Sequence, residues 1–434
     1  MRTTRLSRGY DHVPQLRRVP HAAGEAQLSS HRSARVEIDL GALAVNLRAV
    51  RGAVGQAVVY GVVKADAYGH GAPAVALELE RLGIDGLAVA RATELEELRR
   101  VGYSGRLLLL GGPESAEDLG RAIRWTATPV LTRLGQLAAW SAWLRRSGVG
   151  AGPALEVAVE VDTGMSRSGL DLSDWPEALD DLRAAPEFRF AGLMSHLAES
   201  EQVESSFTGE QERRFAAAAA LLDPSERRSV PAHLANSSAA LRRASARWTA
   251  VRVGGALYGL DLATLVDGSA GAGLRPVMSV KAPIVDMRHV PAGAGVGYRR
   301  TWRAPEPARI ALVRVGYGDG FSSGFGGGEV LVREERCPIV GQVSMDSLTV
   351  DVTRVPTAAI GDECVLLGEQ REQRIGVGEL AGRAGIAAYE VWCGLNLRLP
   401  RLVIGHRDGE SAAKGPVRGS SRGGTRRGSA PSSR

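Results

Sequence analysis

The sequence predicts an α/β protein with an N-terminal (β/α)8 barrel followed by a C-terminal, mainly antiparallel β domain. Residues 35–275 alternate short apolar runs with amphipathic stretches, which is typical of parallel strands buried on both faces. Roughly eight such units in about 240 residues match the size of a (β/α)8 barrel, and a doubly wound sheet is the alternative. Residues 276–406 contain closely spaced β-type runs broken by Gly and Pro, which predicts a compact antiparallel domain.

Individual runs along the chain support each half of this division. The apolar runs that predict barrel strands are Val58–Val63, Leu87–Ala90, Leu107–Leu110, Leu155–Val161, Phe190–Met194 and Val251–Val253. In the second half, residues 277–290, 308–318, 329–334, 337–353 and 363–368 are rich in β-forming residues. Helical patterns at 377–386 and 387–395 interrupt this domain before its last strand.

The basic character of the chain is confined to its two ends. Residues 1–35 and 407–434 each carry a net charge of +5, whereas residues 36–406 carry −4 of the total +6. Both ends are too poor in hydrophobic residues to fold. We therefore expect a flexible basic extension over 1–34 and a disordered Ser/Gly/Arg tail over 407–434. A nucleic-acid partner is disfavoured, and a nucleic-acid-binding arm is the alternative interpretation of these tails.

Composition also bears on the compartment and on metals. No run approaches the roughly 20 apolar residues that span a bilayer, and the N-terminus lacks the apolar core of a secretory signal. Three widely spaced cysteines, Cys337, Cys364 and Cys393, fit neither a disulfide framework nor a metal cluster. We expect a cytoplasmic protein with no metal and no membrane partner.

One lysine stands out because the chain uses arginine almost everywhere else. Only Lys64, Lys281 and Lys414 occur among 54 basic residues. An arginine is never deprotonated in a protein and cannot form an imine, whereas a lysine in a partly desolvated site can. Lys64 directly follows an apolar run, so it should emerge at the C-terminal mouth of the barrel, where such barrels carry their active sites.

The segment VVKADAYGHG (Val62–Gly71) resembles the cofactor-lysine motif of the alanine racemase family. The resemblance continues in order from about Arg35 to Gly405. Its further landmarks are DTGMSRSG (162–169), GLMSHLA (192–198), HLANSSAAL (233–241), VRVGGALYG (251–259), GVGYRRTW (295–302), VGYGDG (315–320), SMDSLTVDV (344–352) and AYEVWCGLNLRLPR (388–401). Eight or nine matches in sequence order make a very specific signal.

The resemblance implies a pyridoxal 5'-phosphate enzyme that interconverts L-alanine and D-alanine and supplies D-alanine for peptidoglycan. It implies a head-to-tail homodimer in which each site combines one subunit's barrel with its partner's β domain. Lys64 would carry the cofactor as a Schiff base and act as one base. Tyr298, from the other subunit, would be the base on the opposite face, because inverting a carbon centre needs proton transfer on both faces.

The same resemblance assigns the remaining site residues. Arg252 would face the pyridine nitrogen and His196 would support it, while Asn236 would orient the cofactor. The phosphate would be bound by Ser237, the backbone of Gly254 and Gly255, and the hydroxyls of Tyr68 and Tyr389. The substrate side would comprise Arg167 at the carboxylate, the Met345 backbone N–H with Asp346 beside it, and Tyr317 at the entrance.

Two departures from the family pattern concern the substrate pocket. Glu160 stands seven residues before Arg167, where some members carry a carbamylated lysine, and Ser344 stands where a cysteine is common. We expect Glu160 to form a charge-assisted hydrogen bond with Arg167, with a solvent-facing Glu160 as the alternative. A serine or broad-specificity racemase and a non-catalytic pyridoxal-phosphate-binding protein remain alternative functions. A decarboxylase of similar architecture is disfavoured, because its Gly-rich phosphate loop and its reactive Cys near a C-terminal Asp are not found.

Overall fold

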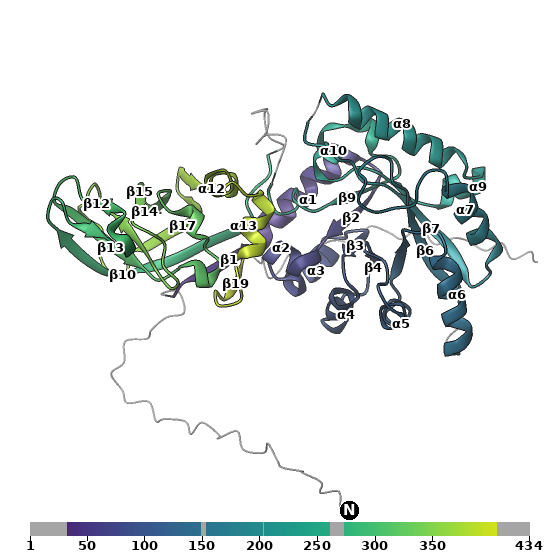
Figure 1. Ribbon diagram of the computed structural model, residues 1–434, viewed down its shortest axis with the longest axis horizontal. Coiled ribbons are helices and arrows are strands. Elements are labelled where there is room, and N and C mark those ends of the chain that lie inside the picture. The colour runs from purple at the N-terminus through teal and green to yellow at the C-terminus, as the bar shows by residue number, and fades with distance from the viewer. Residues whose placement is uncertain (1–32, 149–152, 203, 261–272, 406–434) are drawn as a thin grey trace, which may run out of the picture.

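The computed structural model confirms the predicted barrel and β domain (Figure 1). It describes residues 33–148, 153–202, 204–260 and 273–405, so the expected terminal extensions lie almost wholly outside the described residues. Eight strands close into a barrel because β2 pairs with both β3 and β9, which excludes the doubly wound alternative. Its strands are β2 Val58–Val62, β3 Gly86–Val89, β4 Arg106–Leu109, β5 Thr128–Leu131, β6 Leu155–Glu160, β7 Phe188–Met194, β8 Ala232–His233 and β9 Ala250–Val253.

The inside of the barrel is a packed core rather than a pore. Nearly every strand contributes an inward apolar side chain to one cluster, composed of Tyr60, Val62, Ala88, Leu108, Val130, Ala158, Met194 and Ala250. A larger cluster fills the space between the barrel and its helices and continues into the β domain. The strands are therefore buried on both faces, as their nearly continuous apolar runs predicted.

Helices cover the outside of the barrel. They are α1 Leu40–Val54, α3 Ala72–Arg81, α4 Ala92–Arg100, α5 Ala116–Arg124, α6 Gln136–Ser147, α7 Trp175–Ala184, α8 Ser206–Ala220, α9 Pro224–Ser229 and α10 Ser237–Arg242. The short segment α2 Lys64–Gly69 lies instead at the mouth of the barrel. No helix in the described ranges is long and apolar enough to cross a membrane.

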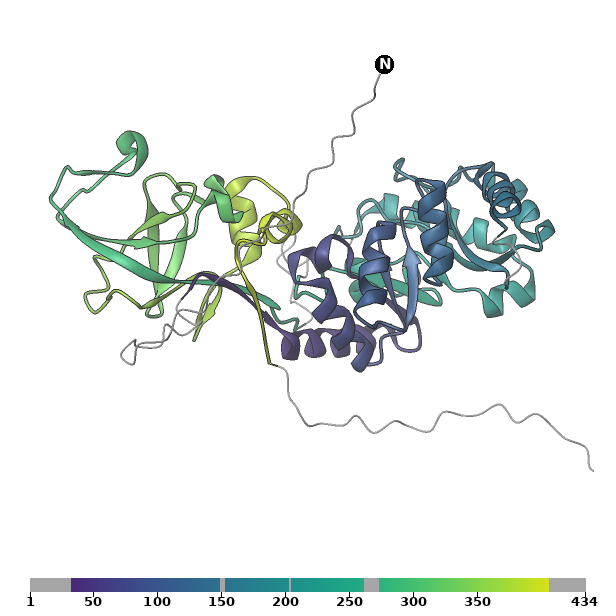
Figure 2. The same cartoon turned by 90° about the horizontal axis from the view of Figure 1, so that it is seen from below.

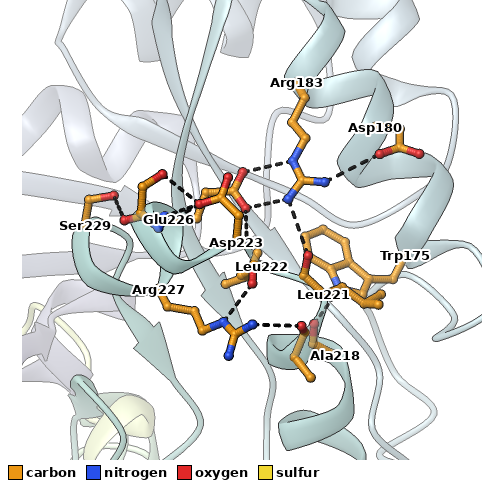
Figure 3. Close-up of polar contacts among 12 residues, drawn as sticks. Trp175, Asp180, Arg183, Ala218, Leu221, Leu222, Asp223, Glu226, Arg227 and Ser229 are labelled. Carbon is orange, nitrogen blue, oxygen red and sulfur yellow. Dashed lines mark hydrogen bonds and ion pairs between the residues drawn. The ribbon is translucent and has the colours of Figure 1, made fainter.

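Side chains tie the helices α7, α8 and α9 to one another (Figure 3). The Trp175 indole N–H donates to the carbonyl of Ala218 at 3.0 Å, which joins α7 to α8. Arg183 of α7 pairs with Glu226 of α9, and Glu226 also accepts the backbone N–H of Asp223 at the start of α9. These contacts lie outside the barrel and fix the helices that follow β6 and β7.

The β domain is built on one nine-stranded sheet in the order β18-β17-β14-β15-β16-β13-β10-β1-β19. Its elements are β1 Arg35–Asp39, β10 Met278–Val290, β13 Ala308–Val313, β14 Glu329–Val332, β15 Glu335–Val340, β16 Leu348–Asp351, β17 Glu363–Gln370, β18 Gln373–Ile375 and β19 Arg401–Ile404. Beside it lie the two-stranded pair β11 Gly295–Val296 and β12 Trp302–Arg303 and the helices α12 Val377–Ala384 and α13 Ala388–Gly394. Figures 1 and 2 show α13 next to α2, between the two domains.

The first strand differs from expectation. We expected residues 35–275 to form the barrel, but β1 lies in the β-domain sheet, antiparallel to β10 and parallel to β19. A short apolar strand fits either sheet, and the partners that decide its place lie more than 200 residues away. The β domain is thus built from both ends of the described chain, and the barrel wall begins at β2.

A buried ionic network fastens β1 to the sheet. Glu37 is 8% exposed and accepts from Arg35 at 2.7 Å, while the Lys281 ammonium of β10 lies 2.8 Å from its other oxygen. Arg35 also donates to Glu363 of β17 at 2.7 Å. Burial opposes ionisation, but Lys281 and Arg35 outweigh it and hold the pKa of Glu37 below its usual 4.5.

Removing Lys281 should destabilise the fold. Lys281→Met leaves a buried carboxylate without one of its partners, so we expect a loss of about 1–3 kcal/mol in the free energy of unfolding at pH 7. A carboxylate with a depressed pKa contributes stability above its unfolded-state pKa, and that contribution is lost as the pH falls through the folded-state value. The difference in the free energy of unfolding between Lys281→Met and wild type, measured by urea denaturation, should therefore be largest at pH 7 and should shrink below about pH 4.5.

The matched control is Arg288→Met on the same strand. Arg288 pairs with Asp286 at the surface with 78% of its side chain exposed, and such pairs contribute about 0–1 kcal/mol. Equal effects of the two substitutions, or a Lys281→Met deficit independent of pH, would contradict a structural role for this network.

Candidate active site

A cavity of about 700 Å³ opens at the C-terminal ends of the barrel strands, where (β/α)8 enzymes place their chemistry. Helix α13 of the β domain contributes part of its wall. The structure brings ten of the predicted site residues to this cavity: Lys64, Tyr68, Arg167, His196, Asn236, Ser237, Arg252, Gly254, Gly255 and Tyr389.

Lys64 occupies the position expected for it, just after β2 and at the start of α2. Burial lowers the pKa of its amine, the nearby Arg167 cation lowers it further, and Glu94 partly opposes both. Since only the neutral amine is nucleophilic, this environment favours reaction with a carbonyl group.

Arg252 of β9 is the buried cation of the site, with 4% of its surface exposed. Its guanidinium donates to the carbonyls of His233 at 2.6 Å and Ser195 at 2.5 Å. It also lies 2.9 Å from Nδ1 of His233 and 3.3 Å from Nδ1 of His196. Because a guanidinium has only donors, both Nδ1 atoms must be acceptors, and each ring proton must sit on Nε2.

The electrostatics of this cluster agree with that assignment. Burial lowers the pKa of His196 to about 3, with Arg252 contributing, and the same causes place the pKa of His233 well below 6.5. Burial lowers the pKa of Arg252 to about 10, while Glu160 opposes the shift. At neutral pH the site therefore holds one arginine cation supported by two neutral imidazoles.

His233 and Ser195 are the parts of this cluster that the sequence reasoning missed. His196 contacts Arg252 as expected, but His233 contacts it at shorter distances and with two atoms. His233 opens the segment HLANSSAAL and ends β8, the strand next to β9. Its place at the end of a barrel strand is the sequence feature that could have identified it as a site residue.

The backbone around Gly254 and Gly255 forms a close-fitting cradle. A Cβ at Gly254 would meet the Tyr68 hydroxyl at 2.6 Å, and one at Gly255 would meet the Tyr389 hydroxyl at 2.6 Å. The Ser237 hydroxyl accepts the N–H of Gly254 at 3.0 Å and that of Ala256 at 3.2 Å. Among the described residues, the Gly255 N–H makes no hydrogen bond.

This cradle fits a phosphate group. Ser237 and Ser238 open α10, so their N–H groups have no partner inside the helix, and both residues line the cavity. Together with the Gly255 N–H and the two tyrosine hydroxyls, they present donors toward one end of the cavity. Such convergent backbone donors are typical of phosphate sites in barrels.

Asn236 lines the cavity, but both ends of its amide already have protein partners. Its Oδ1 accepts the N–H of Ala239 and caps α10, and its Nδ2 donates to Ser200 at 2.7 Å. In this structure Asn236 therefore fixes the first turn of the helix that carries Ser237.

The expected pairing of Glu160 with Arg167 is not formed. Glu160 is 6% exposed, which contradicts the solvent-facing alternative. However, no hydrogen bond or ion pair joins its carboxylate to Arg167 in the described part of the chain, and the charge of Arg252 lowers its pKa more than that of Arg167 does. Arg167 lies on an exposed turn beside Ser166, whose φ is +56°, and this turn places it at the rim. Burial raises the pKa of Glu160, and the two arginines oppose that shift.

Apart from Tyr389, the predicted site residues of the β domain are not at this cavity; they are Tyr298, Tyr317, Met345 and Asp346. Tyr298, Tyr317 and Met345 are 69%, 48% and 53% exposed, and the two tyrosines line a separate hollow on the β domain. Asp346 pairs with Arg398 at 2.6 Å. These side chains are presented on one domain while the Lys64 cavity opens on the other.

No ligand cluster for a metal ion, meaning three or more His, Cys, Asp or Glu side chains, occurs within the described ranges. Of the three cysteines, Cys337 and Cys364 are buried thiols in the β domain and Cys393 lines the cavity.

Comparisons with known proteins agree over both domains. Residues 38–261 match the alanine racemase N-terminal domain family, and residues 277–403 match the alanine racemase C-terminal domain family. An alanine racemase of Sorangium cellulosum is 38% identical over 86% of this chain and 99% of its own length. One from Synechocystis sp. is 35% identical over 85% of this chain and 98% of its own.

Solved structures give the same result. The biosynthetic alanine racemase of Pseudomonas aeruginosa superposes with a TM-score of 0.77 at 33% identity, covering 86% of this chain and 99% of that one. The alanine racemase of Bartonella henselae, solved with covalently bound pyridoxal phosphate, has a TM-score of 0.76 at 27% identity, with the same coverages.

Filling the cradle should weaken binding of pyridoxal phosphate. In Gly254→Ala the new methyl group forces the Tyr68 hydroxyl away, so we expect the dissociation constant to rise about tenfold or more, as overpacking of about 1–3 kcal/mol implies. Absorbance titration of cofactor-free protein with pyridoxal phosphate measures this dissociation constant. Gly52→Ala, in open space on α1, should leave affinity unchanged; unchanged affinity in Gly254→Ala as well would show that the cradle does not hold the phosphate.

Proposed function

The chain belongs to the alanine racemase family, and we propose that it interconverts L-alanine and D-alanine with pyridoxal phosphate as cofactor. The observation that carries this proposal is the placement of Lys64. Its amine, with a lowered pKa, shares one barrel-mouth cavity with the buried Arg252 cation and the Gly254–Gly255 cradle. A lysine for covalent attachment, a donor for a ring nitrogen and a phosphate cradle are the three features that this cofactor requires.

The residues present suit the cofactor's chemistry. Pyridoxal phosphate, when bound, supplies an electron sink that acidifies the Cα–H of an attached amino acid. The cradle and α10 would hold its phosphate, and Lys64 would hold its aldehyde carbon. Arg252 can only donate, so it would leave a facing ring nitrogen unprotonated, which moderates the electron sink and limits side reactions.

Racemisation needs a proton-transfer group on each face of the substrate carbon. We assign Lys64 Nζ to one face and the Tyr298 hydroxyl to the other, with Tyr298 removing the proton from the L-enantiomer. Arg167, at the rim of the cavity, is the cation available for the substrate carboxylate. Met345 and Asp346 complete that pocket and Tyr317 narrows its entrance.

These last four residues require a second copy of the chain. Tyr298, Tyr317 and Met345 are large side chains left exposed on the β domain, outside the cavity that holds Lys64. Soluble surfaces rarely leave such groups together without a partner. A homodimer that places one copy's β domain over the other's barrel supplies the second base and closes the cavity against water.

For its biological setting we propose the reducing cytoplasm and the supply of D-alanine to peptidoglycan. The three free cysteines support a reducing compartment. A serine or broad-specificity racemase shares the same site residues, and alanine is favoured because the relatives are named for it.

The cofactor assignment predicts a coloured protein. The purified protein should absorb visible light, and borohydride should bleach that band and leave a pyridoxal label on Lys64, which peptide mass spectrometry locates. Lys281→Ala serves as the matched lysine control and should take the label at Lys64 as wild type does. A colourless protein that binds no pyridoxal phosphate would sink the proposed function.

The shared site predicts complementation between inactive variants. Tyr298→Phe should keep the visible band but lose roughly 10²–10⁴-fold in turnover, the usual contribution of a general acid–base group. Mixing it with Lys64→Ala should restore activity, because some mixed dimers contain one intact site. Subunit exchange that is demonstrated by mass labelling without any return of activity would rule out the cross-subunit arrangement.

A further inference from the structure

The backbone directly after Lys64 is left-handed. Four consecutive non-glycine residues, Ala65 to Tyr68, have φ of 52–54° and ψ of 42–53°. Each such residue costs about 1–2 kcal/mol relative to a right-handed conformation, and isolated positions are the rule rather than runs. A run of four persists only where its surroundings impose it. This turn connects Lys64 to Tyr68, the hydroxyl of the phosphate cradle.

His70 contacts the carbonyl groups of this turn. Its Nδ1 lies 2.9 Å from the carbonyl oxygen of Ala67 and 3.0 Å from that of Tyr68. Carbonyl oxygens only accept, so Nδ1 must carry the ring proton. The other nitrogen, Nε2, is buried without a hydrogen-bond partner, which leaves no acceptor for a second proton. Burial accordingly lowers the pKa of His70 to about 3.

The imidazole is itself held from two sides. It stacks on Tyr258 with ring centroids 4.4 Å apart, and it meets the edge of Trp392 at 5.1 Å. The Tyr258 hydroxyl donates to the carbonyl of Val62 at 2.9 Å, on the strand that leads to Lys64. Trp392 belongs to α13 of the β domain, and a Cβ at Gly69 would come within 2.5 Å of its carbonyl oxygen.

Other contacts fasten the two ends of the turn. Glu94 accepts the N–H of Ala65 at 2.7 Å, and Asp66 accepts the N–H of Ala72 at 2.6 Å. The backbone N–H of His70 also reaches the carbonyl of Ala67 at 3.2 Å. Among the described residues, the carbonyl of Tyr68 has its hydrogen bond from the His70 ring alone.

We propose that His70 is a positioning residue whose Nδ1–H holds the left-handed turn 65–68, and through it Lys64 and Tyr68, in the geometry that receives the cofactor. This inference rests on the proposed function for the cofactor, although the turn itself is a feature of the chain alone. The link through Trp392 means that the β domain of the same chain supports the lysine, in addition to the domain that a second copy would bring.

Two substitutions separate the hydrogen bond from the packing. In His70→Asn the amide Nδ2 is as many bonds from Cα as the imidazole Nδ1, so the donor is kept and the rest of the ring is lost. In His70→Phe an aromatic ring stays between Tyr258 and Trp392, and the donor is lost. His289→Phe, at an exposed position on β10, is the control. The readouts are the dissociation constant of pyridoxal phosphate and amide hydrogen exchange across residues 62–72 of the full chain without cofactor.

We expect His70→Phe to lose about tenfold or more in affinity and to exchange faster across 62–72, as a lost buried hydrogen bond implies. His70→Asn should stay closer to wild type in both, and His289→Phe should match wild type. The proposal is overturned if His70→Phe equals wild type, or if His70→Asn and His70→Phe lose affinity and protection equally, since keeping the donor would then make no difference. If His70→Phe fails to fold, amide hydrogen exchange in His70→Asn decides the question. Protection retained across residues 62–72 supports the donor role of His70, and protection lost there overturns it. Wild-type protein that binds no cofactor would refute the proposed function, while exchange would still test the turn.

Discussion

The candidate site depends on keeping the Arg252 guanidinium charged inside the barrel. An isolated buried cation is very costly, so it persists only where its donors are matched by acceptors. Here the acceptors come from two neighbouring strands, since Ser195 and His196 follow β7 and His233 ends β8. Glu160, at the end of β6, adds a negative charge. None of these groups can serve unless the barrel is closed and in register. The charged state of Arg252 at the barrel mouth therefore depends on closure of the barrel.

The two histidines show how this constraint sets protonation. Each gives its Nδ1 lone pair to Arg252, so each must remain neutral, and burial enforces this by lowering both pKa values. His70 is neutral for a related reason but in the opposite tautomer, because its Nδ1 faces two carbonyl oxygens. The tautomers of all three rings follow from what the neighbouring groups can donate or accept.

Local sequence patterns predicted the barrel and the β domain, because apolar runs and strand ends are local features. The ten residues around the cavity were predicted from the resemblance of their motifs to the alanine racemase family. Lys64 was identifiable from its rarity and its place after an apolar run. What escaped prediction depends on contacts between distant segments. Strand β1 joins the β domain because its partners are β10 and β19. Arg167 forms no ion pair with Glu160 because it lies on the exposed turn at Ser166. His233 contacts Arg252 only because β8 and β9 are neighbours.

The two proposed proton-transfer residues share a backbone setting that spacing alone does not reveal. Lys64 precedes the left-handed run 65–68, and Tyr298 precedes Arg299 and Arg300, whose φ values are 57° and 50°. Unfavourable backbone of this kind is retained where the surrounding structure imposes it and a side chain must point in one direction. The settings differ in burial, since Lys64 lies within a cavity while Tyr298 is 69% exposed. A rigid turn can hold an exposed tyrosine ready for a second copy of the chain, whereas the buried lysine needs packing from its own chain. That difference explains why packing from both the barrel and the β domain of one chain holds Lys64 in place.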